Sequence, residues 1–109
     1  MSSAWRIRLV AIADRDYQEI VKRSAQDFGA RQARAYAKTM EMAITALREK
    51  GPETIGAKKR EEIGPGLFSL HAARGRRKAS HFLLFRVRQN HTIEILRILH
   101  ERMDLARHI

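Results

Sequence analysis

Four basic side chains near the ends of predicted strands are of the types that cleave RNA without a metal ion. They are His81, Arg97, His100 and Arg102. Such a reaction needs a group that takes the proton of the 2′-hydroxyl, cations that bind the phosphate, and an acid that protonates the leaving oxygen. Arginine and histidine are common in any chain of this charge, so an ordinary solvated surface is the alternative interpretation.

The C-terminal tail has a spacing that a metal site could use. His100, Asp104 and His108 follow one another every fourth residue, which would place them on one face of a helix. Ligands stacked along one helix converge poorly on a single ion, so we predict no metal site. The Gly-Pro-Gly at 64–66 lacks the rest of a phosphate-binding loop and predicts a turn. The absence of cysteine excludes thiolate zinc sites and cysteine nucleophiles, and no cofactor is expected.

The charge balance indicates an acidic partner. The 109 residues include 22 Lys+Arg and 12 Asp+Glu, a formal net charge of +10. Basic clusters at 58–60 and 74–78 fall in predicted loops, where they are either solvated or in contact with an acidic partner or a phosphate backbone. No fold that reads a nucleic-acid sequence is evident. No apolar run is long enough for a signal peptide or a membrane span, so we expect an intracellular, cytoplasmic protein without membrane contact.

The elements that position these residues follow from hydrophobic periodicity. Alternation predicts a first strand, and helical spacing then predicts two amphipathic helices separated by Gly29. Three strands follow, and the second is the most continuously apolar, as a central strand should be. The predicted strands are Trp5–Ala11, Leu67–Ala73, His81–Arg88 and Thr92–Leu99; the helices are 13–28 and Arg31–Lys50; residues 53–66 form a solvated loop, 74–78 and 89–91 are hairpin connections, and His100–Ile109 is a short helix or an extended cap.

This order of elements predicts a single α+β domain over residues 1–109. The short link at Gly29 forces the two helices into an antiparallel hairpin, because both apolar stripes must face a common layer. We therefore expect an N-terminal strand and a helical hairpin packed on one face of an antiparallel sheet, to which the three C-terminal strands belong.

The segment Ile95–Asp104, which reads Ile-Leu-Arg-Ile-Leu-His-Glu-Arg-Met-Asp, closely resembles the C-terminal signature of ParE toxins in the RelE/ParE superfamily. Three further segments are similar to the family's first helix, inter-helix junction and central strand; they are 13–20, 28–36 and 81–87. The resemblance implies a RelE/ParE-like fold with a helical hairpin on an antiparallel sheet. It also implies the toxin of a type II toxin–antitoxin system that inhibits DNA gyrase.

Further expectations rest on the same resemblance. A cognate ParD-type antitoxin would neutralise the toxin through an acidic C-terminal segment, forming a hetero-oligomer, although no antitoxin-binding residues are assigned. The tail residues Arg102, Met103 and Asp104 are the candidates for contact with the target, and a gyrase inhibitor has no catalytic residues. RelE-type relatives instead cleave mRNA on the ribosome, which would use the four basic residues named first. A third possibility is a non-toxic family member that only binds an antitoxin.

Overall fold

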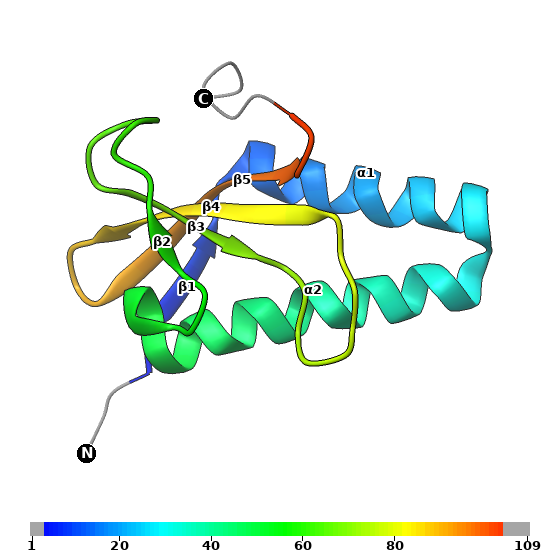
Figure 1. The fold of residues 1–109 in the computed structure, drawn as a ribbon, viewed down its shortest axis with the longest axis horizontal. Coiled ribbons are helices and arrows are strands. Elements are labelled where there is room, and N and C mark those ends of the chain that lie inside the picture. The colour runs from blue at the N-terminus through cyan, green and yellow to red at the C-terminus, as the bar shows by residue number, and fades with distance from the viewer. Residues whose placement is uncertain (1–3, 104–109) are drawn as a thin grey trace.

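The computed structural model describes residues 4–103 as two helices packed on a five-stranded sheet (Figure 1). The α+β class and the order strand, helical hairpin, strands are as predicted. The elements are β1 (Arg6–Leu9), α1 (Ala11–Phe28), α2 (Ala30–Lys50), a 3₁₀ turn η1 (Gly51–Glu53), β2 (Lys58–Lys59), β3 (Leu67–His71), β4 (His81–Arg88) and β5 (Thr92–His100).

The helical hairpin turns at a single residue. Gly29 has φ of 92°, a conformation that side chains disfavour, and it ends α1 and begins α2. Its N–H donates to the Ala25 carbonyl, and its own carbonyl accepts the Ala33 N–H. At the other end of α1, the predicted first strand ends early at Leu9, because the Val10 carbonyl already accepts the Asp14 N–H of the first helical turn.

The sheet is mixed rather than wholly antiparallel. Its order is β1-β5-β4-β3-β2, with β1 parallel to β5 and the other pairs antiparallel. The helical hairpin carries the chain away from β1, and the meander of β3, β4 and β5 brings it back beside β1 in the same direction. A parallel pair requires a long crossover of this kind, and a hairpin turn cannot provide it.

The predicted loop at 53–66 contains more structure than expected. Lys58 and Lys59 form the edge strand β2, which pairs with Ser69 and Phe68 of β3. Both lysines are exposed, so no apolar alternation marks the strand in the sequence. The Gly-Pro-Gly segment at 64–66 is a turn, as predicted.

The core lies where the helices meet one face of the sheet. Its largest fully buried side chains include Met40 and Leu47 of α2, Phe85 of β4 and Ile95 of β5. The burial of such side chains supplies most of the free energy that holds the two layers together. Among residues 4–103, neither helix is apolar over a length that would cross a bilayer.

A separate contact joins three distant parts of the chain near the N-terminus. The Trp5 N–H donates to the Arg48 carbonyl at the end of α2, and the Trp5 ring stacks on His91 with 3.6 Å between centroids. Gly51 lies directly against the indole, where a Cβ would be 2.4 Å from a Trp5 ring atom. His91 belongs to the predicted turn between β4 and β5, where Asn90 and His91 both have positive φ.

Candidate functional site

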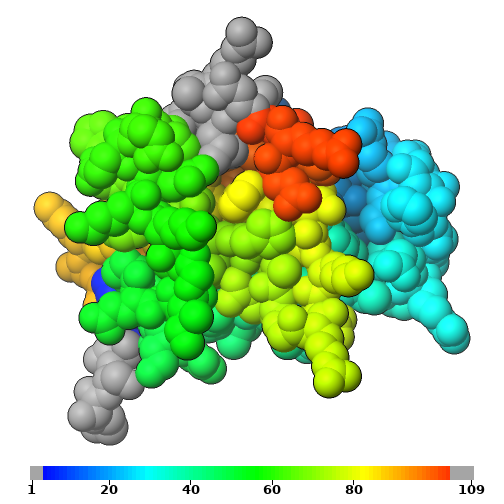
Figure 2. Space-filling view, in the orientation of Figure 1, coloured from blue at the N-terminus to red at the C-terminus, as the bar shows by residue number. Residues whose placement is uncertain are grey.

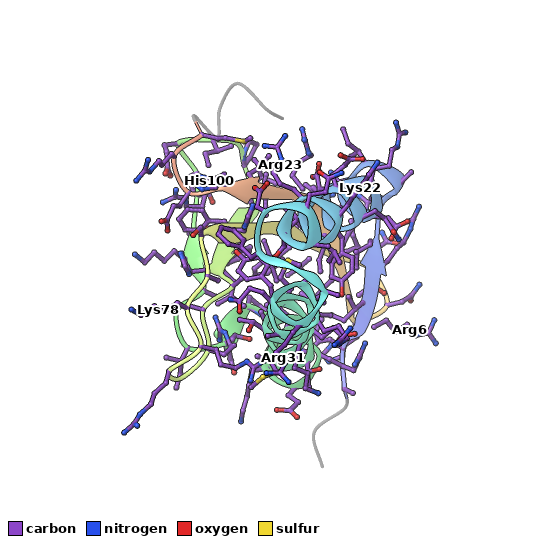
Figure 3. The ribbon with its side chains drawn as sticks, turned by 90° about the vertical axis from the view of Figure 1, so that its right-hand side faces the viewer. Arg6, Lys22, Arg23, Arg31, Lys78 and His100 are labelled. Atoms are coloured by element: carbon purple, nitrogen blue, oxygen red, sulfur yellow. The ribbon has the colours of Figure 1, made fainter. Side chains whose placement is uncertain are left out.

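A groove of about 730 Å³ lies between the helical hairpin and the ends of β4 and β5 that face it. Figure 3 looks toward this side of the molecule, with His100 and Arg23 near one another at its upper edge. Two of the exposed large apolar side chains, Phe28 and Met103, are 73% and 45% exposed and both line it. The lining residues are Asp16, Glu19, Ile20, Arg23, Ser24, Asp27, Phe28, Gln32, Tyr36, 78–81, 97–100 and Met103.

An ion pair closes one wall of this groove. The Arg97 guanidinium donates to both carboxylate oxygens of Asp16, at 2.8 and 3.1 Å, and the two side chains are only 20% and 15% exposed. Asp16 also accepts the Ile98 N–H at 2.9 Å. Because β1 pairs with β5 only as far as Ile95, Asp16 takes the place of a neighbouring strand for this backbone donor. The hydrogen bond to Asp16 raises the pKa of Arg97.

A tyrosine from α2 and a histidine from β4 form the inner end of the groove. The Ser80 N–H donates to the Tyr36 hydroxyl at 2.9 Å, and that hydroxyl lies 2.6 Å from Nδ1 of His81. The hydroxyl accepts from Ser80, so it has its own proton to donate to a neutral His81 ring. Burial, with the nearby His100 as a second cause, lowers the pKa of His81 to about 4. Burial also raises the pKa of Tyr36.

The second histidine of the groove is the cross-strand partner of the first. His81 and His100 are opposite one another in the sheet, with ring centroids 5.3 Å apart in an edge-to-face arrangement. Nδ1 of His100 accepts the Arg102 N–H at 3.1 Å, which shapes the turn after β5. Just beyond, Glu101 contacts His71 of β3 at 2.8 Å, and this hydrogen bond lowers the pKa of Glu101.

The structure brings together three of the four residues proposed for RNA cleavage. His81, Arg97 and His100 line the groove, whereas Arg102 lies in the turn after β5 and does not. Met103 is at the rim, where residues 101–103 (red in Figure 2) lie beside the segment before β4. Asp104 and His108 fall outside the described residues, as does the tail beyond 103. His100 continues β5 and is not part of a terminal helix.

The sequence analysis missed two groove residues, Tyr36 and Asp16. The hydroxyl of Tyr36 is a usable signal in the sequence, because a tyrosine on the apolar face of a helix needs a hydrogen-bond partner when it is buried. Asp16 gave no such signal, since its partner Arg97 is 81 residues away in the chain. Within residues 4–103, no group of three or more His, Cys, Asp or Glu side chains is arranged to hold a metal ion.

Comparison with known proteins places this geometry in a family. Residues 7–105 match the family described as ParE toxin of type II toxin-antitoxin system, parDE. No curated protein matches the sequence at a significant level.

Several solved structures share the fold. A chain of the chromosomal ParDE toxin–antitoxin system from P. aeruginosa is similar with a TM-score of 0.71 and 19% identity, covering 91% of this chain and 98% of that one. A chain of the RelBE2 toxin–antitoxin complex from Mycobacterium tuberculosis has a TM-score of 0.56 and 26% identity, covering 89% and 98%. A chain of the heterotetrameric YoeB–YefM complex from Staphylococcus aureus has a TM-score of 0.55 and 19% identity, covering 90% and 98%. The match over residues 7–105 shows that the chain belongs to the ParE toxin family of type II toxin–antitoxin systems.

Proposed function

We propose that this toxin inhibits DNA gyrase and that a cognate ParD-type antitoxin neutralises it by forming a hetero-oligomer. The observation that carries the proposal is the family match, which extends through the tail segment that includes Arg102 and Met103. The chemistry of the groove supports a protein partner. Exposed Phe28 and Met103 offer apolar surface to a protein, and mixed charges around them suit a specific interface.

The same groove is poorly suited to phosphate. Its lining contains three carboxylates and three permanent cations, so its formal charge is 3 − 3 = 0 when the histidines are neutral; these are Asp16, Glu19, Asp27, Arg23, Lys78 and Arg97. Arg97 is already bound to both oxygens of Asp16. His81 has its Nδ1 against Tyr36 and a pKa of about 4, so it carries no charge at neutral pH.

We assign contact with the target to the tail residues Arg102, Met103 and Asp104, of which Met103 lines the groove. Arg102 and Met103 are exposed in the turn after β5. A supercoiling assay with purified toxin and gyrase tests the proposal, and unaffected supercoiling at excess toxin would reject gyrase as the target. Met103→Ala should weaken inhibition at least about fivefold, because the variant would lose one apolar contact with gyrase that is worth about 1–2 kcal/mol when buried. The matched control is Met42→Ala, an exposed methionine on α2, which should inhibit like the unchanged protein.

Ribosome-dependent mRNA cleavage is the second candidate, and the juxtaposition of His81 and His100 favours it. Primer extension on translated mRNA after toxin induction would reveal codon-linked cuts if this candidate is right. In that case His100→Gln should abolish the cuts, whereas under gyrase inhibition the transcripts are intact.

Co-expression tests the antitoxin part of the proposal. We expect growth arrest on expression of the toxin alone and recovery when a neighbouring ParD-type gene is expressed with it. Normal growth without that gene would instead identify a non-toxic, antitoxin-binding family member.

A further inference from the structure

A second groove, of about 690 Å³, lies on the sheet around the turn between β4 and β5. Two rows of side chains cross the three strands β1, β5 and β4 there. In one row Arg6, Thr92 and Arg88 are neighbours in the strand register. In the adjacent row, which is two residues away on each strand, Arg8, Glu94 and Arg86 are neighbours. We call this surface the arginine groove; Figure 3 shows Arg6 projecting outward from β1, on the opposite side from Lys78.

Glu94 holds the guanidinium groups in place. Its side chain is only 6% exposed and lies 2.8 Å from Arg86, 3.2 Å from Arg8 and 3.9 Å from Arg88. The side chains of the arginines are 42%, 70% and 53% exposed in the same order. Each guanidinium has five N–H donors, so each retains donors that point to solvent. The buried carboxylate thus restricts the arginines without neutralising them.

The charge of the arginine groove is strongly positive. Three arginines and one carboxylate, Glu94, line the groove, and Arg86 beside Glu94 brings the formal charge of this small area to 4 − 1 = +3. Arg6 has no side-chain hydrogen bond or ion pair to any residue in 4–103, which leaves its charge available. Alternate residues of a strand are about 7 Å apart, and β1 and β4 are separated by about 10 Å across β5. The guanidiniums therefore present a small, flat array of cations to one side of the molecule.

We propose that the arginine groove binds the phosphodiester backbone of duplex DNA without reading its sequence. Arginine forks match phosphate oxygens in geometry and charge. No aromatic side chain lines the groove, and single strands need such side chains for base stacking. An acidic peptide that folds on binding needs apolar burial to offset its ordering entropy, and only Ile7 and Val87 supply apolar lining. The choice of DNA over RNA rests on the proposed function, because gyrase acts on duplex DNA.

The test is fluorescence anisotropy of a labelled duplex DNA with the full-length toxin and no gyrase present. The variant replaces Arg6, Arg8 and Arg88 with glutamine, and keeps Arg86 so that Glu94 retains its nearest partner. Loss of three phosphate contacts should make the negative slope of log K for DNA binding against log salt concentration less steep by about 3. It should also weaken binding at 0.1 M salt at least about tenfold. The matched control replaces three exposed arginines of the helices with glutamine, giving the same change in net charge; these are Arg15, Arg31 and Arg34.

Equal DNA affinity in the two triple variants would overturn the proposal, as would salt-independent binding by the unchanged toxin. Tighter binding of a polyglutamate peptide or of duplex RNA than of duplex DNA would also overturn it, by assigning the groove to that ligand. Single Arg6→Gln keeps every ion pair to Glu94 and should weaken binding about two- to fivefold, which covers the case in which the triple variant does not fold. A toxin that binds DNA through this groove but leaves supercoiling unaffected would reject gyrase as the target and keep the groove.

Discussion

Substitution of Asp16 by asparagine is the sharpest test of how the groove is built. The change removes a charge that Arg97 binds at 2.8 and 3.1 Å, and weakens the acceptor of the Ile98 N–H. Removing one partner of a largely buried ion pair costs about 3–5 kcal/mol, and the 20% residual exposure of Arg97 places the value near the lower end. We therefore expect a loss of about 3 kcal/mol, which lowers Tm by about 12 °C or more in a domain of this size.

Urea unfolding followed by far-UV circular dichroism measures this difference in the free energy of unfolding. Asp14→Asn, an exposed change on the same helix, should stay within about 1 kcal/mol of the unchanged protein. The double variant Asp16→Asn with Arg97→Gln should be more stable than the sum of the single losses predicts, because it leaves no unpaired charge. Equal stability of Asp14→Asn and Asp16→Asn would refute the reasoning.

Three further predictions concern other contacts. His81 has a pKa of about 4 in the folded protein, against an ordinary 6.5, so the unfolded chain binds more protons between these two pH values. The free energy of unfolding should therefore fall as the pH drops from 6.5 to 4. His81→Gln should flatten the curve of Tm against pH. Tyr36→Phe removes the proton donated to neutral His81, so NMR titration should show a higher His81 pKa, with a loss of about 1–2 kcal/mol in chemical denaturation. Gly51→Ala forces a Cβ to within 2.4 Å of Trp5 and should cost more than about 2 kcal/mol in thermal unfolding, whereas Gly75→Ala, with similar φ and open space, should cost only about 1 kcal/mol.

Local pattern was sufficient for the helices and for most of the strands. Local pattern predicted α1, α2, β3, β4 and β5 to within about two residues, because a helical period marks the buried faces of the helices and nearly continuous apolar runs mark the buried strands β4 and β5. The two-residue strand β2 escaped prediction because Lys58 and Lys59 are both exposed. The parallel pairing of β1 with β5, which makes the sheet mixed, was not predicted either. This pairing joins segments far apart in the sequence and depends on the path of the whole chain between them.

The candidate site was predictable only in part. His81 and His100 stood out by residue type, but their pairing was not predictable. The register of the hairpin at 89–91 would place His81 opposite Leu99, and an irregularity between Leu84 and Phe85 shifts the pairing by one residue to His100. The bonds from Tyr36 to His81 and from Asp16 to Arg97 link residues 45 and 81 positions apart, and no local pattern indicates such distant partners.

The sequence by itself determined the helices, the main strands, the +10 charge and the resemblance to ParE toxins, because each depends on residue type and short-range order. Only the tertiary structure decided how that charge is distributed. It pairs Arg97 with Asp16 and leaves the groove beside the helices balanced, while it gathers three arginines around Glu94 on neighbouring strands. The reason is that strand register sets which charges become neighbours, and the register of this sheet depends on contacts between segments far apart in the chain.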